Sequence, residues 1–170
     1  QEVVVRVLNP RNLLKEMLNA RRQNYSSLPI GLTAFYREGV EHKKRNVDLT
    51  EAVLQIYKSP YDQPYQTDQV KLIKMRRILD RQEVDTFVTK IRSGIHSILQ
   101  LDVIKNEPDF FDLDPVVNPF DYSHTDIAVV DNRLANVISF EQRKGVDEPL
   151  YRGELFIDTE NNALLEARFE

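Results

Sequence analysis

The chain has 170 residues, of which 41% are hydrophobic and 29% are charged, a balance typical of one globular domain with a buried core. It has no cysteine, which excludes disulfide bonds, thiolate metal sites and cysteine nucleophiles. No apolar run approaches the roughly 18 residues of a membrane span, and no signal-peptide pattern opens the chain, so we expect no transmembrane segment.

The net charge of −4 is unevenly distributed along the chain. Residues 1–95 carry 17 Lys/Arg against 11 Asp/Glu, a net of +6, whereas residues 96–170 carry 6 against 16, a net of −10. A basic half can indicate nucleic-acid binding. Here the charges alternate with apolar residues at strand spacing, and no pair of base-stacking aromatic residues lies among them. We therefore expect no nucleic-acid partner, and interpret the charges as two solvated sheet faces.

The first predicted helix begins after Asn9, which is a good N-cap residue, with Pro10 at the first helical position. Its apolar residues recur at helical spacing, and a segment rich in Ser and Pro ends it near Asn24. The chain opens on Gln1 rather than Met, so we expect Gln1 to mark a cut or processed end.

A change to a period of two predicts three strands, over 31–40, 47–58 and 70–79. The first two are joined by a polar turn at 42–46, and a loop with Pro and Tyr at 59–66 precedes the third. These strands are expected to form an antiparallel meander.

A second helix is predicted after Asp80, because apolar residues keep helical spacing up to Leu99, with Gly94 as a kink or a break. Residues 106–118 form an acidic loop bounded by proline.

Four more strands are predicted over 122–130, 134–142, 150–158 and 163–169, with a two-residue turn at Asp131-Asn132. Antiparallel strands interrupted by two helices indicate an α+β fold. We expect one domain over residues 1–170 with a curved antiparallel β-sheet, an incomplete β-barrel, covered by two helices.

The residues that could carry chemistry form no convincing site. His42, His96 and His124 lack the i, i+4 spacing of a helical metal site, so we predict no metal. The glycines are scattered and make no phosphate-binding loop, and no serine lies in a nucleophile elbow. We predict no catalytic residues and no cofactor. A cone-shaped α+β enzyme with an Asp/His pair in its cavity remains a minor alternative.

The acidic loop is the other chemical candidate, with carboxylates at Glu107, Asp109, Asp112 and Asp114 that could bind calcium. The order of acids in an EF-hand is absent, because Phe110-Phe111 and Pro115 interrupt the run. The alternative is an acidic loop whose two phenylalanines tuck under a sheet edge.

Apolar side chains on the predicted strands and the second helix are candidates for a ligand cavity. If the helices fill the concave side of the sheet, these side chains are core. If the sheet curls away from the helices, the same side chains line an apolar cavity. The candidates are Phe35, Tyr36, Val53, Ile56, Ile73, Phe87, Ile91, Ile138, Phe140 and Phe156.

Five segments carry a resemblance that covers nearly the whole chain. They are NYSSLPIGLTAFYRE (24–38), LTEAVLQIYKSPY (49–61), DQVKLIKMRR (68–77), LQLDVIKN (99–106) and LYRGELFIDTENNALLEARF (150–169). In order and spacing they resemble a Bacteroidetes family of cell-envelope proteins with carboxypeptidase-regulatory-like domains. In that family a small β-sandwich domain precedes this region, so residues 1–9 would be its last strand or a linker. One departure is Ile95 after Gly94, where relatives are expected to have Gly-Pro.

The order of strands and helices also resembles the lipoprotein-localisation carriers, in which a half-barrel lidded by helices holds acyl chains. Carriers of this fold continue with further strands beyond the position of Glu170. The resemblance implies a periplasmic or outer-membrane location and a non-catalytic domain that binds a lipid, another apolar molecule or an envelope protein. The alternative is a purely structural module that links a regulatory-like domain to an outer-membrane component.

Overall fold

The computed structural model describes residues 8–63, 65–79 and 95–170. The chain divides into two compact units, of which the first comprises Gln1–Tyr25 with Asp102–Glu170 and the second comprises Ser26–Leu101. Each unit has its own antiparallel sheet.

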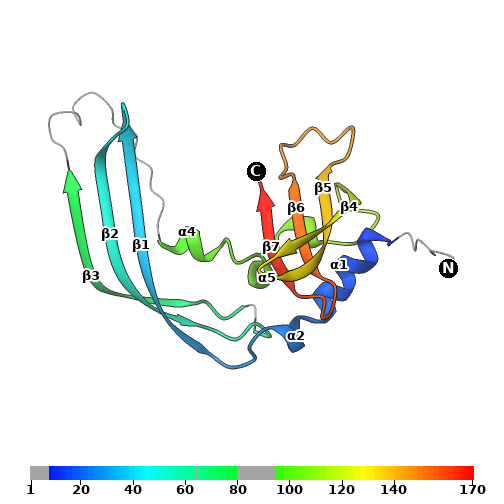
Figure 1. Ribbon diagram of the computed structural model, residues 1–170, viewed down its shortest axis with the longest axis horizontal. Coiled ribbons are helices and arrows are strands. Elements are labelled where there is room, and N and C mark those ends of the chain that lie inside the picture. Colours follow the sequence, from blue (N-terminus) through cyan, green and yellow to red (C-terminus); the bar gives the residue numbers. More distant parts are fainter. Residues whose placement is uncertain (1–7, 64, 80–94) are drawn as a thin grey trace. The chain divides into compact units, whose positions relative to one another are not determined.

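The second unit contains a three-stranded sheet in the order β1-β2-β3. The strands are β1 (Ile30–His42), β2 (Arg45–Lys58) and β3 (Gln69–Leu79), and they are long and strongly bent (Figure 1). Two irregularities interrupt the pairing, between Val40 and Glu41 on β1 and between Val53 and Leu54 on β2. Such bulges increase local twist and bend a strand. A short helix, α4 (Ile95–Leu99), belongs to the same unit.

The turn between β1 and β2 has two central residues, Lys43 and Lys44, with φ of 48° and 65°. Left-handed backbone at both positions fits the twist of a tight hairpin. The Asp131-Asn132 turn has the same form, with φ of 48° and 64°, as the sequence predicted.

The first unit contains a four-stranded sheet in the order β4-β5-β6-β7. Its strands are β4 (Phe120–Val130), β5 (Arg133–Gln142), β6 (Gly153–Asp158) and β7 (Leu164–Phe169). The helices of this unit are α1 (Pro10–Asn19), α2 (Arg21–Asn24), α5 (Val103–Asn106) and the 3-10 turn η1 (Asp109–Phe111).

Asn9 caps α1 as expected, since its Oδ1 accepts hydrogen bonds from the backbone N–H groups of Arg11 and Asn12. The apolar stripe of α1 is buried, and Arg11 donates to the Phe120 carbonyl at the start of β4. The helix is thereby fixed to the edge of the four-stranded sheet.

An aromatic cluster fills the core of this unit. Phe110 stacks on Phe140 with ring centroids 4.4 Å apart, and its ring also lies 4.9 Å from Phe111 and 5.6 Å from Phe169. Tyr122 donates its hydroxyl to the Phe110 carbonyl at 2.7 Å, which holds η1 against the sheet. The expectation that Phe110 and Phe111 tuck under the sheet is confirmed, since both are buried.

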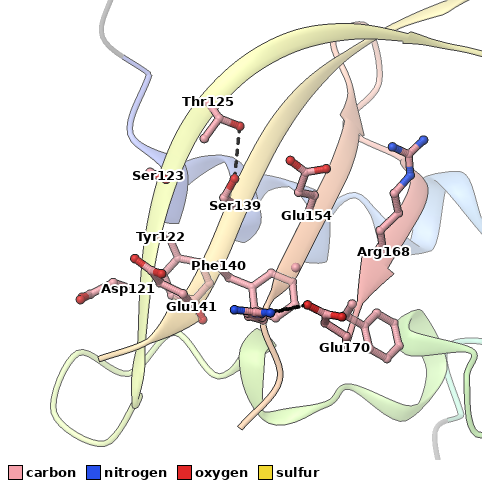
Figure 2. Close-up of a pocket in the computed structure, with 13 residues that line it drawn as sticks. Asp121, Tyr122, Ser123, Thr125, Ser139, Phe140, Glu141, Glu154, Arg168 and Glu170 are labelled. Carbon is pink, nitrogen blue, oxygen red and sulfur yellow. Dashed lines mark hydrogen bonds and ion pairs between the residues drawn. The ribbon is translucent and has the colours of Figure 1, made fainter. Parts of the chain in front are cut away.

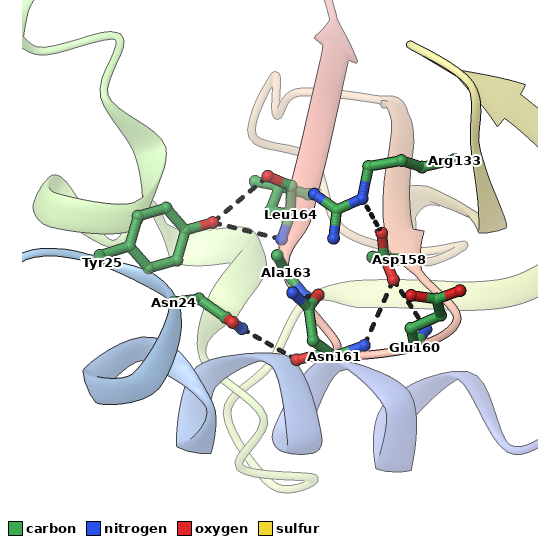
Figure 3. A network of polar contacts seen from close by, with 8 residues as sticks. All are labelled: Asn24, Tyr25, Arg133, Asp158, Glu160, Asn161, Ala163 and Leu164. Carbon is green, nitrogen blue, oxygen red and sulfur yellow. Dashed lines mark hydrogen bonds and ion pairs between the residues drawn. The ribbon is translucent and has the colours of Figure 1, made fainter.

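A polar network ties α2 to the hairpin between β6 and β7 (Figure 3). Asn24 donates to the Asn161 carbonyl at 2.9 Å, and the Tyr25 hydroxyl lies 3.2 Å from both the nitrogen and the oxygen of Leu164. The turn itself is held by the buried Asp158, whose Oδ1 accepts from two backbone N–H groups and whose Oδ2 pairs with Arg133 at 2.6 Å.

The predicted order of three strands and then four strands is confirmed, and the protein is mostly antiparallel sheet with few helices. The expected single sheet is wrong for the described strands, which form two sheets. The two sheets are separated in the chain by the long connection from Leu79 to Phe120. The expectation of one domain over residues 1–170 stays a prediction.

The helices also differ from expectation. The predicted first helix is divided at Ala20, where ψ is −3°, and this rotation directs Asn24 and Tyr25 to the β6–β7 hairpin. Of the predicted second helix, Ile95–Leu99 is helical, and residues 80–94 lie outside the described residues.

Candidate functional site

Eight of the ten apolar candidates fall on described strands, which belong to two different sheets. Phe35, Tyr36, Val53, Ile56 and Ile73 lie on the three-stranded sheet, and Ile138, Phe140 and Phe156 lie on the four-stranded sheet. Phe87 and Ile91 fall outside the described residues. Because the two sheets belong to different units, each group is considered separately.

On the four-stranded sheet the three candidates are packed. Ile138 and Phe140 are buried, and Phe140 is part of the aromatic cluster. Phe156 is buried with Ala135 and Val137 in a second small cluster, under the guanidinium of Arg168, whose carbon lies 4.6 Å from the ring centroid. These three residues act as core.

On the three-stranded sheet one face is apolar over all three strands. The strand register pairs Ala34 with Leu54 and Leu54 with Leu72, which makes one row of side chains across the sheet. Two flanking rows are formed in the same way. We call this three-by-three grid the apolar face; it consists of Leu32, Ala34, Tyr36, Ala52, Leu54, Ile56, Val70, Leu72 and Met75.

The centre of the apolar face is buried and its margin is open. Tyr36, Ala52, Leu54 and Ile56 form a buried cluster, against which Leu99 of α4 packs. At the margin, Leu32, Leu72 and Met75 remain 43%, 50% and 57% exposed. Large apolar side chains that stay half exposed beside a buried cluster offer surface for a further apolar group.

Charged groups bound one end of the apolar face. The Tyr36 hydroxyl donates to Glu38 at 2.6 Å, and Arg77 forms two hydrogen bonds with the Asp48 carboxylate. The hydrogen bond from Arg77 is the main cause that lowers the pKa of Asp48 below its ordinary value. The apolar face therefore changes to a polar surface along the strands.

The opposite face of this sheet carries Phe35 and Val53, which the register pairs. They line a shallow pocket of about 290 Å³ together with Lys74 and Arg76. Glu51 lies between Arg37 and Arg76 on this face and pairs with both. Phe35 and Tyr36 were both candidates as apolar strand residues, but a strand puts neighbouring residues on opposite faces.

A larger hollow of about 610 Å³ lies on the four-stranded sheet and was not predicted (Figure 2). Its lining includes a row of polar side chains on four neighbouring strands, Ser123, Ser139, Glu154 and Arg168. The period-two alternation places these residues on one face, but only the strand register brings them into one row.

His124, one of the histidines that the enzyme alternative would pair with an aspartate, contacts an amide side chain. Nε2 of His124 lies 3.2 Å from the amide oxygen of Asn136, not from a carboxylate. Within residues 8–63, 65–79 and 95–170, no three or more His, Asp and Glu side chains are grouped to hold a metal ion. No helix formed by these residues is both long and apolar enough to cross a membrane.

Comparisons with known proteins give little further information. No family model matches the chain, and no curated protein matches it. Among solved structures the chain is similar to a DUF1329 family protein from Desulfovibrio piger, with 13% sequence identity, a TM-score of 0.38, and coverage of 95% of this chain and 74% of that chain. At that TM-score the similarity supports no statement about fold or function.

Proposed function

We propose that this protein is a non-catalytic binding domain of the cell envelope, and that the apolar face of the three-stranded sheet holds an acyl chain or a similar apolar ligand. The observation that carries the proposal is the grid itself: nine apolar side chains aligned across three strands, with Leu32, Leu72 and Met75 at its margin about half exposed. The envelope location rests on the family resemblance of the sequence.

The size of the grid suits one extended hydrocarbon chain. The width of the grid is two interstrand spacings of about 4.8 Å, or about 10 Å. Its length along β1 is four residue steps of about 3.4 Å, or about 14 Å. The sheet bends along its strands, as Figure 1 shows for β1 to β3, which favours wrapping around a ligand over flat stacking.

The expected affinity follows from the apolar surface that the ligand buries. About eight methylene groups at about 0.8 kcal/mol each would contribute about 6 kcal/mol, which corresponds to a Kd of the order of tens of micromolar. Ordering of the acyl chain on binding makes the binding free energy less favourable, so a Kd above this range also agrees with the proposal. A nanomolar Kd would need contacts beyond this face.

The proposal is tested by titrating the purified protein with a fluorescent fatty acid, and then displacing the probe with unlabelled palmitate. We expect saturable binding that palmitate reverses. The variant Leu72→Glu introduces a charge in the central row of the apolar face and should weaken binding at least tenfold, since an unpaired carboxylate beside an acyl chain is poorly solvated.

The matched control is Ile78→Glu, also on β3, where Ile78 is paired with Leu49 on the opposite face and is 55% exposed. It adds the same charge at a similar exposure and should leave binding within about twofold, because that face does not meet the ligand. Met75→Gln serves as a second, milder variant should Leu72→Glu disturb folding. Absence of saturable binding, or equal effects of the two glutamates, would refute the proposal.

An envelope protein is the other occupant that the resemblance allows. In that case the fatty acid would not bind, and the apolar face would instead be covered by a protein partner. A purely structural module predicts neither binding nor a difference between the two variants.

A further inference from the structure

The hollow on the four-stranded sheet is a second candidate binding site, separate from the apolar face. Its floor is built from two rows of polar side chains. The register pairs Ser123 with Ser139, Ser139 with Glu154 and Glu154 with Arg168, so the first row crosses all four strands (Figure 2). Three interstrand spacings of about 4.8 Å make this row about 14 Å long, which suits an elongated ligand better than a single ion.

The second row lies two residues further along the strands. Asp121 and Glu141 face each other on β4 and β5. Arg152 and Glu170 exchange backbone hydrogen bonds of 3.0 Å just beyond the ends of β6 and β7, and their side chains form a further pair. Both rows therefore contain groups that accept and groups that donate hydrogen bonds.

The two guanidinium groups of the hollow are already engaged. Arg168 makes two hydrogen bonds with Glu166, and Arg152 makes two with Glu170. Glu141 and Glu154 form no salt bridge among the described residues, although the charge of Glu154 interacts with that of Arg168. An anionic ligand such as a phosphate would meet these carboxylates and find no uncommitted cation.

A polycation would fit little better along the same floor. The first row ends on Arg168, and the second row also contains a guanidinium, so positive charges spaced along a ligand would meet repulsion within one or two strand spacings. A neutral ligand rich in hydroxyl groups meets no such penalty, because each hydroxyl can donate to a carboxylate or accept from a guanidinium or serine.

The polar groups are held in place before a ligand arrives. Ser139 donates to Thr125 at 3.3 Å, and Arg168 is fixed between Glu166 and the ring of Phe156. The ring of Phe169, which borders the hollow, packs against Phe110 and Tyr151 at centroid distances of 5.6 Å and 5.4 Å and is held in place as well.

We propose that this hollow binds a neutral oligosaccharide of two or three units, through the row of Ser123, Ser139, Glu154 and Arg168. Its volume of about 610 Å³ lies within the range of small-molecule sites. This site does not depend on the apolar face, and either one can bind without the other.

The test uses NMR amide shifts of the whole chain with cellotriose, maltotriose and chitotriose as probes, and with spermidine and inositol hexakisphosphate as charged comparators. We expect at least one trisaccharide to shift the amides of β4 to β7 in a saturable manner. Ser139→Ala and Glu154→Ala should each weaken that binding about tenfold, the effect of losing one or two hydrogen bonds to a charged or polar group.

Glu154→Gln separates a sugar site from a cation site, because glutamine still offers a carbonyl acceptor without the charge. In Glu154→Gln the Kd for the sugar should stay within about threefold of that of the unsubstituted chain. The control is Glu160→Ala, which changes an exposed carboxylate on the β6–β7 turn outside the hollow and should leave the Kd within about twofold. The proposal is overturned if no trisaccharide shifts these amides at about 10 mM, well above the millimolar range of weak binding. It is also overturned if spermidine binds more tightly than every sugar, or if the variants have no effect.

Discussion

Phe110→Ala probes the aromatic cluster that holds the 3-10 turn against the four-stranded sheet. The Phe110 side chain is 1% exposed and lies against four other phenylalanine rings, including Phe140 at 4.4 Å and Phe120 at 6.4 Å. Loss of the buried ring removes about 2 to 3 kcal/mol of transfer free energy. A residual void of about 80 Å³ at about 24 cal/mol per Å³ adds about 2 kcal/mol. We expect the free energy of unfolding of this unit to fall by about 4 kcal/mol.

The assay is urea unfolding followed by far-UV circular dichroism, with hydrogen exchange measured on peptides from β5. Exchange on β5 reports the unit that contains Phe110, even if the two units unfold separately. The matched control is Phe35→Ala, in which the same side chain is removed from a position that is 66% exposed, and it should cost less than about 1 kcal/mol. A cost below about 1 kcal/mol for Phe110→Ala, or unchanged exchange on β5, would show that this ring is not in a packed core.

Two further predictions concern single contacts in the same unit. Burial is the main cause that raises the pKa of Tyr25 above its ordinary value, so the folded chain keeps a proton that the unfolded chain releases, and stability should fall as the pH rises above about 10. Burial raises the pKa of Tyr122 as well, so Tyr25→Phe should reduce this alkaline dependence in urea titrations without abolishing it, and should cost about 1 kcal/mol at neutral pH. Gly153→Ala should destabilise the sheet by about 3 kcal/mol in thermal or urea unfolding, because an added Cβ would meet the Arg168 carbonyl oxygen of β7. The matched control is Gly31→Ala, which has open space around the added Cβ and should change the free energy of unfolding by less than about 1 kcal/mol. Equal effects of the two alanines would contradict the close approach of β6 and β7.

Much of the fold could be predicted because its strands are long and alternate regularly. The hairpin turns also follow from local sequence, as at Asp131-Asn132, since two residues with left-handed backbone fit a tight turn. The division into two sheets could not be predicted, because it depends on which strands remain unpaired across a long connection.

The candidate sites were harder to predict, for a physical reason that Phe35 and Tyr36 illustrate. A period of two says that adjacent residues lie on opposite faces, but it does not say which face becomes buried. Tyr36 belongs to the buried cluster, and Phe35 is exposed on the other side. The irregularity at Val53 and Leu54 shifts the register further, so that the grid on the apolar face appears only once the pairing is known.

Contacts between distant parts of the chain left no sequence signal. The Tyr25 hydroxyl meets the backbone of Leu164, 139 residues away, and this contact fixes the end of α2. The row from Ser123 to Arg168 likewise arises from the register of four strands, and no local motif marks it.

The most direct test of the account is photo-crosslinking with a fatty acid that carries a diazirine near the end of its chain, followed by peptide mapping of the labelled residues. The apolar face predicts labels on Leu72 and Met75 of β3, with Leu32 of β1, and their loss when palmitate is added in excess. Labels on Ile78 or Phe35 of the opposite face, or labelling that palmitate does not displace, would contradict the claim that the apolar face holds an acyl chain.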